Sequence, residues 1–234
     1  MKLSIIIPIY NEEKTIRELL KKVIAVDIPL KKEIICIDDG SVDSSGDIVK
    51  DVIEECNDIS YYYKKNKGKG SAIRLGFRKA TGDIFIVQDA DLEYDPEDYN
   101  KLLKPILDGN VKVVYGSRYL SEVGHLEQHH LTYRIHKFGN RFLSFMTTLL
   151  YHAKITDMET CYKVFTREVY ERLRLHSNDF AIEPEITSKI LKKGFKIREV
   201  NINYYSRDFD EGKKITWVDG VKALLYLVKY RFMN

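Results

Sequence analysis

Residues 84 to 96 read Ile-Phe-Ile-Val-Gln-Asp-Ala-Asp-Leu-Glu-Tyr-Asp-Pro, and this stretch decides the fold class. It begins with four consecutive apolar residues and continues with carboxylates at alternate positions, Asp89, Asp91 and Glu93. A strand that buries its apolar side chains cannot also bury three charges, so we expect the acids just beyond the point where the strand leaves the sheet. Open α/β sheets bind their ligands at that edge.

The composition is that of an ordinary globular protein. The chain has 234 residues, 44% of them hydrophobic, which suffices for one α/β domain with an appendage. With 38 basic and 35 acidic residues the formal charge is +3, which does not indicate a nucleic-acid partner. Cys36, Cys56 and Cys161 follow no metal-ligand spacing and suit free thiols in a reducing compartment. The sequence contains no apolar run of membrane-spanning length.

Strand-like and helix-like patterns alternate in the first half of the chain. Asn11 is expected to cap the first helix. The alternation predicts an α/β fold with a mostly parallel sheet and right-handed crossovers. The expected strands are residues 3–9, 33–37, 59–63, 84–87 and 111–115, and the expected helices are residues 16–24, 48–53 and 72–80.

After residue 120 the pattern changes to two amphipathic helices. An amphipathic helix either covers the core or lies on another apolar surface, and the sequence leaves both open. The first stripe is Phe138, Phe142, Phe145, Met146 and Leu149, opposite Asn140, Arg141, Ser144 and Thr148; the second is Val221, Leu224, Leu225, Val228 and Phe232.

The alternate carboxylates Asp89, Asp91 and Glu93 suit a hard divalent cation, because Mg²⁺ and Mn²⁺ prefer oxygen ligands and keep coordination sites for water and phosphate. Such an ion would neutralise a diphosphate leaving group. The alternative is a solvated turn, with Pro96 starting the next helix. Haloacid-dehalogenase-type phosphatases also carry Asp-x-Asp after a strand. Their motif follows the first strand, however, and has Thr or Val where this chain has Glu93.

A second acidic turn, Asp38-Asp39-Gly40-Ser41, follows the strand expected at 33–37, which places it on the same sheet edge. Ser41 is also explained as a helix cap, whereas the two acids are not. The loop Lys67-Gly68-Lys69-Gly70-Ser71 lacks the Walker spacing, and the chain has no G-x-G-x-x-G motif. A basic, glycine-rich loop before a helix still suits a pyrophosphate.

Five motifs together resemble family 2 glycosyltransferases of the GT-A fold, in the order and spacing of the dolichyl-phosphate mannose synthase group. The resemblance implies one GT-A catalytic domain over residues 1–234, with a nucleotide-sugar-binding half at 1–120 and an acceptor half at 121–234. The motifs are Pro8-Ile9-Tyr10-Asn11-Glu12, Asp38-Asp39-Gly40-Ser41, Asn66-Lys67-Gly68-Lys69-Gly70, Asp89-Ala90-Asp91 and Gly116-Ser117-Arg118-Tyr119.

The resemblance also implies roles for single residues. Asp91, Arg118 and Glu185 would be catalytic, with Glu183 as an unresolved rival of Glu185. Asp89, Asp91 and Glu93 would hold Mg²⁺ or Mn²⁺. The expected nucleotide-sugar site is Pro8, Tyr10, Glu12, Asp38, Asp39, Lys69, Asp89, Ala90 and Asp91, and the expected acceptor-phosphate site is Arg118, Arg134, Arg207 and Lys213.

The segment Asp157-Met158-Glu159-Thr160-Cys161-Tyr162 resembles an acidic segment of the family that reads Asp-x-x-Ser/Thr-Gly-Phe/Tyr. Cys161 stands in place of the usual glycine, which alters the expected backbone there.

The expected reaction is inverting, metal-dependent transfer of a hexose from GDP-mannose, UDP-glucose or UDP-N-acetylglucosamine to dolichyl or polyprenyl phosphate. A phosphate monoester is largely dianionic near neutrality and scarcely needs a protein base. The acceptor is a membrane lipid, so we expect peripheral contact at the cytoplasmic face, directly or through a membrane-protein partner. A soluble or polysaccharide acceptor and a non-catalytic nucleotide-sugar-binding scaffold are the alternatives.

Overall fold

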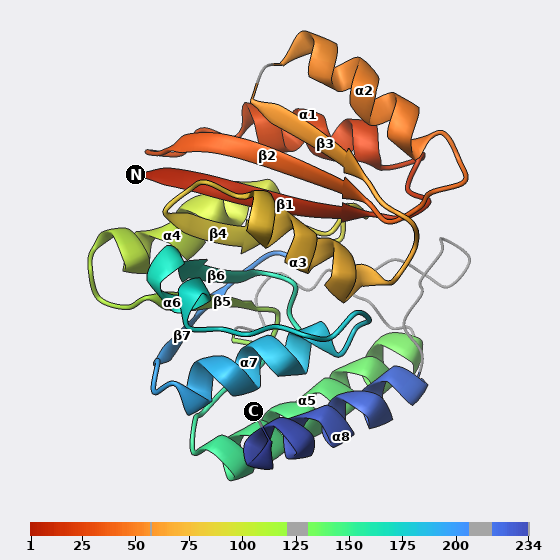
Figure 1. Cartoon of the computed structure of the whole chain (residues 1–234). Helices are drawn as coiled ribbons and strands as arrows, with labels where there is room; N and C mark the ends of the chain where they lie inside the picture. The colour runs from red at the N-terminus through yellow and green to blue at the C-terminus, as the bar shows by residue number, and fades with distance from the viewer. Residues whose placement is uncertain (57, 121–130, 206–216, 234) are drawn as a thin grey trace.

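The structure, a computed structural model, describes the chain except for residues 57, 121–130, 206–216 and 234, and it describes no side chains at 131–137 and 217–219. A seven-stranded sheet in the order β3-β2-β1-β4-β6-β5-β7 forms its centre. All neighbouring strands pair in parallel except β6, which is antiparallel to both β4 and β5. The predicted α/β class and mostly parallel sheet are therefore confirmed (Figure 1).

The elements alternate along the first half as expected. The strands are β1 (Lys2–Ile9), β2 (Lys31–Asp38), β3 (Ile59–Tyr63), β4 (Ile84–Val87), β5 (Val113–Ser117), β6 (Lys163–Thr166) and β7 (Ile197–Asn201). The helices are α1 (Ile16–Ala25), α2 (Ser45–Glu55), α3 (Lys69–Lys79), the 3₁₀ turn η1 (Pro96–Asp98), α4 (Tyr99–Leu107), α5 (Leu131–Tyr151), α6 (Arg167–Glu171), α7 (Ile182–Lys192) and α8 (Trp217–Phe232).

The main core lies against the sheet. The central strand β4 is apolar and buried throughout, and β1 is buried except at Lys2 and Pro8, as expected for strands that are covered on both faces. On one side of the β4–β6 pair, Phe77 of α3 packs against Phe85 and Phe165, with ring centroids 5.7 and 5.4 Å away. This packing holds the β4 end, and thus the acidic turn after it, in a fixed place.

The expected cap of the first helix is wrong. Thr15 precedes α1 as its N-cap and makes no side-chain cap hydrogen bond. Asn11 instead adopts a left-handed backbone with φ 53°, and its Oδ1 accepts a hydrogen bond from the Val42 amide at 2.9 Å. Asparagine is one of the few residues that tolerate this conformation, and here it joins the loops after β1 and β2.

Helices α5 and α8 lie side by side as an outer layer; both pack against α7, and α5 also contacts the segment before β6 (Figure 1). The polar side of α5 faces inward: Asn140 and Ser144, expected opposite the apolar stripe, are both buried. Its apolar stripe faces outward, with Phe138 76% and Phe145 62% exposed. The predicted apolar stripe therefore lies on the exposed side of α5, while Leu143 packs inward in a small apolar cluster with Met158, Ala223 and Leu227.

Candidate active site

The acidic turn after β2 is already organised by hydrogen bonds. Asp38 accepts from the Ser41 amide and the Tyr61 hydroxyl, both at 2.7 Å. Asp39 accepts from the Gly68 amide at 2.7 Å and forms an ion pair with Lys64. Both carboxylates are buried at the carboxyl end of β2. Asp39 fixes the glycine-rich loop against this end of the sheet, and both acids lie on the edge where the sequence predicted them.

A chain of ion pairs starts at the acidic turn after β4, where Asp89 and Lys69 are partly exposed, and ends in the interior at Lys163. Lys69 Nζ lies 2.7 Å from Asp89 Oδ1 and 3.6 Å from Glu183 Oε1. Glu183 also pairs with Lys163, whose ammonium group donates to the Thr160 carbonyl. Burial alone would lower the pKa of Lys69, but the charge of Asp89, with that of Glu183, raises it well above its usual value. Lys69 is therefore a fixed cation beside Asp89.

The turn after β4 has a built-in bend. Leu92 has a left-handed backbone with φ 63°, and the Glu93 amide donates to Asp91 Oδ1 at 3.2 Å. Glu93 Oε2 accepts from the Tyr204 hydroxyl at 2.8 Å. Below the turn, the fully buried Gln88 accepts hydrogen bonds from Tyr99 and Tyr162. The turn is thus supported from the core and tied to the segment after β7.

Arg118, at the end of β5, is bound to Asp157. Its Nε and Nη2 donate to the two carboxylate oxygens at 2.7 and 2.8 Å, and its backbone amide donates to Asp157 Oδ2 at 3.0 Å. Its guanidinium carbon lies 4.9 Å from the centre of the Tyr204 ring. Burial opposes the charge, but Asp157 raises the pKa of Arg118 well above its usual value. The Arg118–Asp157 pair lies at the side of the candidate site that is nearest α5.

Glu185 lies away from this edge. Its carboxylate is fully buried, accepts from the amides of His176 and Ser177, and pairs with Lys189 Nζ at 2.6 Å. Burial would raise the pKa of Glu185, and the hydrogen bonds from Lys189 and Ser177 lower it. Of the two rivals on α7, Glu183 contacts Lys69 in the candidate site, and Glu185 holds the loop that precedes α7.

The remaining predicted residues divide into two groups. Ala90 is buried beside α1, with its carbonyl accepting from the Thr15 hydroxyl at 2.7 Å, and Glu12 accepts from the same hydroxyl at 3.1 Å. Pro8 and Tyr10 lie at the end of β1, so the structure brings them to the same edge as Asp38 and Asp89. Arg207, Lys213 and the side chain of Arg134 lie outside the described residues.

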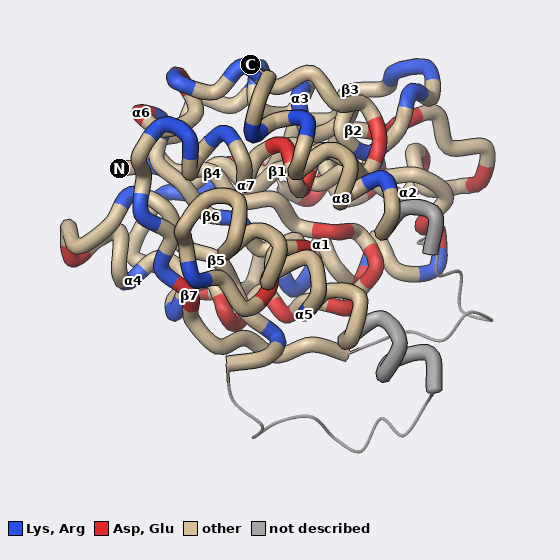
Figure 2. The backbone as a smooth tube through the Cα atoms, turned by 90° about the horizontal axis from the view of Figure 1, so that it is seen from below, with Lys and Arg blue, Asp and Glu red and all other residues tan. Residues whose placement is uncertain are grey.

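A metal site made by protein alone is not present in the described ranges, since no three His, Cys, Asp or Glu side chains converge there. Asp91 and Glu93 supply the oxygen donors that Mg²⁺ and Mn²⁺ prefer, and Asp89 is paired with Lys69. These residues fit an ion that takes part of its coordination from phosphate and water. Figure 2 shows acidic and basic segments interspersed along the described backbone.

Sequence reasoning gave no role to Lys163, Tyr204 or Asp157. A lysine at the start of an apolar strand, Lys163-Val164-Phe165, is the available signal for the first, because a buried lysine needs a fixed anionic partner. Asp157 begins a segment already noted for its family likeness. Nothing in the sequence pattern identifies Tyr204.

Comparison with known proteins finds relatives over most of the chain. An uncharacterized protein of Methanocaldococcus jannaschii is 30% identical over 234 residues, covering 96% of this chain and 90% of its own. A dolichol-phosphate mannosyltransferase of Pyrococcus furiosus is 32% identical, over 91% of this chain and 59% of its own length. A dolichyl-phosphate beta-glucosyltransferase of Dictyostelium discoideum is 29% identical, over 98% of this chain and 74% of its own.

Among solved structures, glucosyl-3-phosphoglycerate synthase from Mycobacterium tuberculosis, in complex with Mn²⁺, UDP-glucose and phosphoglyceric acid, superposes with a TM-score of 0.74. It is 17% identical and covers 100% of this chain and 80% of its own, which shows a shared fold. The family model described as glycosyl transferase family 2 matches residues 4–174. The chain therefore belongs to glycosyl transferase family 2 and is a glycosyltransferase with the GT-A fold.

Proposed function

We propose that this glycosyltransferase transfers a hexose from a nucleotide sugar to a polyprenyl or dolichyl phosphate, with inversion at the anomeric carbon. The observation that favours a lipid acceptor is the outward-facing apolar stripe of α5, a helix whose polar side contacts the candidate active site. The names of the Pyrococcus and Dictyostelium relatives agree with this acceptor class.

The donor is proposed to bind along the carboxyl ends of β1, β2 and β4, in the half of the chain before residue 120. Asp38 and Asp39 would face the nucleoside, as the family likeness implies. The start of α3 offers the Lys69 ammonium group to the diphosphate, and the helix dipole favours an anion at this end. Because Lys69 is held by Asp89 and Glu183, no reorganisation is needed to place its charge.

A Mg²⁺ or Mn²⁺ ion would be held by Asp91, with Glu93 and Asp89 as neighbours, and by the donor diphosphate. When bound, it would supply positive charge to the departing diphosphate. The Mycobacterium synthase binds Mn²⁺ together with UDP, or Mg²⁺ together with UDP, in its solved structures.

The acceptor phosphate is proposed to bind at Arg118. Two of its donor positions are committed to Asp157, which fixes the guanidinium plane, and the rest of the group can bind phosphate oxygens. Arg134, Arg207 and Lys213 are proposed to complete the phosphate site. The dianionic phosphate attacks the anomeric carbon directly, so an α-linked donor yields a β-linked product. Glu183, in contact with Lys69, is a better candidate than Glu185 for a role beside the reacting groups.

The acceptor would be reached by peripheral binding to the cytoplasmic face of a membrane, directly or with a membrane-protein partner. No helix among the described residues is long and apolar enough to cross a bilayer. Exposed lysine and arginine on α8 suit the anionic headgroups of that face. The exposed apolar side chains are Phe138, Phe142, Phe145 and Leu149 on α5 and Val221, Leu225, Val228 and Phe232 on α8, and the basic ones are Lys222, Lys229 and Arg231.

A nucleotide-sugar panel and one substitution test this function. With Mn²⁺ present, one sugar nucleotide should raise the Tm, and vesicles containing polyprenyl phosphate should then yield a β-linked lipid-phosphate sugar. Asp91→Ala should lower turnover by about 10²- to 10³-fold, because the leaving diphosphate loses stabilisation. Asp108→Ala, on the exposed end of α4, is the matched control and should leave turnover unchanged.

Transfer to a soluble saccharide but not to the lipid would contradict the proposed acceptor. Full retention of lipid glycosylation by Asp91→Ala would contradict the proposed leaving-group site. An α-linked product would exclude single displacement.

A further inference from the structure

Two buried polar atoms on neighbouring residues have no hydrogen-bond partner in the described part of the chain. They are Glu159 Oε1 and Thr160 Oγ1. Leaving such a group unpaired in the interior costs about 1–3 kcal/mol, and more for a charged group. Buried polar atoms are normally satisfied, so an adjacent unsatisfied pair beside a ligand site indicates a partner that arrives with the ligand.

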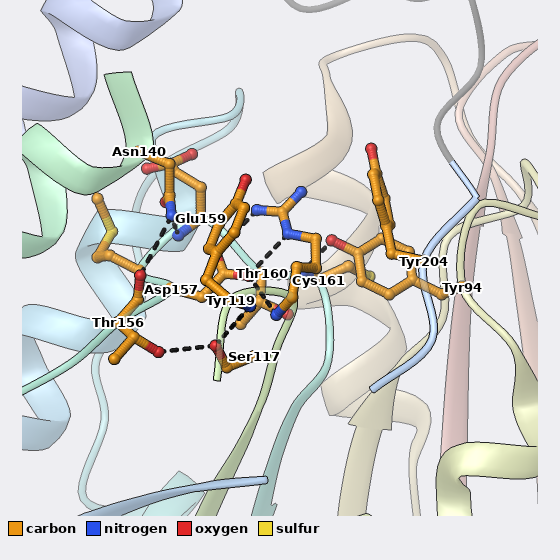
Figure 3. Close-up of polar contacts among 12 residues, drawn as sticks. Tyr94, Ser117, Tyr119, Asn140, Thr156, Asp157, Glu159, Thr160, Cys161 and Tyr204 are labelled. Atoms are coloured by element: carbon orange, nitrogen blue, oxygen red, sulfur yellow. Dashed lines mark hydrogen bonds and ion pairs between the residues drawn. The ribbon is translucent and has the colours of Figure 1, made fainter. Parts of the chain in front are cut away.

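The segment that holds this pair is fixed on both sides. Glu159 donates its amide to Asn140 Oδ1 of α5 at 3.2 Å (Figure 3), and Cys161 donates its amide to the Tyr94 hydroxyl at 3.1 Å. Cys161 Sγ also lies 3.5 Å from the Val87 carbonyl at the end of β4, two residues before Asp89. The pair therefore lies between the proposed leaving-group turn and the helix with the exposed apolar stripe.

The nearby cations are committed elsewhere. Lys163 binds Glu183 and the Thr160 carbonyl, and Arg118 forms its two-oxygen pair with Asp157. Burial raises the pKa of Glu159 to about 7; Lys163 and Arg118 oppose the shift, and the charges of Glu183 and Asp157 add to it. The Glu159 carboxyl group is thus placed among charges without being paired to any of them.

The chemistry of the reactants selects the partner. A carboxylate oxygen accepts hydrogen bonds, and a threonine hydroxyl both donates and accepts. Diphosphate and phosphate dianions present acceptors only, whereas sugar hydroxyls donate and accept. The ribose hydroxyls would lie with the nucleoside beside Asp38 and Asp39, at the other end of the edge.

We infer that Glu159 and Thr160 form the subsite that binds hydroxyl groups of the transferred hexose. This inference rests on the proposed function and adds residues that recognise the sugar, as distinct from the nucleotide. Glu159 accepts from a sugar hydroxyl, and Thr160 exchanges hydrogen bonds with the same or the next hydroxyl. Since Lys163 and Asp89 are fixed nearby, the sugar ring would lie between this pair and the turn after β4.

Calorimetric titration of the full chain with Mn²⁺ can separate sugar from nucleotide. The probes are UDP against UDP-glucose and GDP against GDP-mannose. The informative pair is the one in which the wild type binds the nucleotide sugar more tightly than the corresponding nucleoside diphosphate. Glu159→Ala should weaken that sugar nucleotide by about 10- to 100-fold, because a hydrogen bond to a charged group contributes about 1.5–3 kcal/mol. The affinity for the corresponding diphosphate should stay within twofold.

Three further variants make the result specific. Thr160→Val keeps the shape and should weaken the sugar nucleotide by about 3- to 10-fold, as loss of a neutral hydrogen bond does. Glu159→Gln retains an acceptor oxygen and should recover part of the affinity. Glu171→Gln, at an exposed residue of α6, is the matched control and should bind like the wild type. The Tm of each variant shows that it is folded.

The pH dependence of sugar-nucleotide binding is a further test, because it would not change if Glu159 had only a structural role. Glu159 is protonated below pH about 7, and a sugar hydroxyl donates better to the carboxylate. The wild-type preference for sugar nucleotide over diphosphate should therefore rise from pH 6 to pH 8, and Glu159→Gln should remove this rise. Equal weakening of both probes by Glu159→Ala and Thr160→Val would overturn the inference. If the wild type binds neither nucleotide form, the proposed function fails first and the subsite with it.

Discussion

Helices α1 and α5 are both amphipathic, yet they present opposite sides to the protein. In α1 the apolar residues Ile16, Leu19, Leu20 and Val23 are fully buried, and the charged side faces solvent. In α5 the small polar residues are buried and the phenylalanines are exposed. An apolar stripe alone therefore does not tell which way a helix faces.

The inward side of α5 explains its orientation. Ser144 Oγ accepts from the Met158 amide at 3.1 Å, and Asn140 binds the segment next to it. These side chains satisfy backbone groups that would otherwise be buried without partners. The polar side of α5 thus supports the candidate active site. Its apolar side is left exposed, where it could contact a membrane.

The largest expected effect comes from a matched pair of leucines. Leu19→Ala in α1 should lower the free energy of unfolding by about 2–5 kcal/mol, because it leaves a cavity in the core. Leu149→Ala in α5, which is 58% exposed, should change it by less than about 0.5 kcal/mol. Urea unfolding of both variants measures the difference. Equal losses would mean that the α5 stripe is packed after all.

Polar substitution of the exposed stripe of α5 should weaken membrane binding and leave the stability unchanged. Phe142→Ser with Phe145→Ser should weaken binding to anionic vesicles by roughly 30- to 150-fold, equivalent to about 2–3 kcal/mol of lost apolar transfer. The Tm and nucleotide binding should be unchanged. Vesicle sedimentation measures the effect, and undiminished binding would remove α5 from the membrane contact.

The smallest effect concerns charge on α8. Lys222→Gln and Lys229→Gln should each weaken binding to anionic vesicles by about fivefold, or about 1 kcal/mol per residue. The loss should shrink at high salt and vanish on neutral lipid. Lys21→Gln, on the exposed side of α1, is the control and should bind as the wild type does. An identical loss in the Lys21 variant would point to net charge and not to this surface.

Much of the fold could be predicted because local pattern and tertiary environment agree in the first half. Residues 84–87 are a buried strand, and the acids after them lie at its carboxyl end. The position of β6 could not be predicted in this way, because Lys163 begins an antiparallel strand that enters between β4 and β5 from far along the chain. The Asn11 cap failed because a tertiary contact with Val42 took over its side chain.

The candidate site could be predicted where a motif fixes the local backbone. It could not where long-range packing decides which of two nearby residues faces the site. Asp38, Asp39, Lys69 and Asp89 come together because parallel strands end at one edge. Glu183 and Glu185 are two residues apart on α7, and the helix rotation decides that the first faces Lys69 and the second faces Ser177. That rotation depends on contacts with distant elements.

The position of β6 also sets the order in which a growing chain can complete this enzyme. On the ribosome, β5 is synthesised before either of its sheet neighbours, β6 and β7. Until residue 201 has been synthesised, one or both edges of β5 present unpaired backbone groups to other chains. The segment that carries Asp157 and the first turn of α7 are added in the same late stage. The loops after β1, β2 and β4 thus exist on the nascent chain before the segment that carries Asp157, and both edges of β5 are paired only when β7 is added.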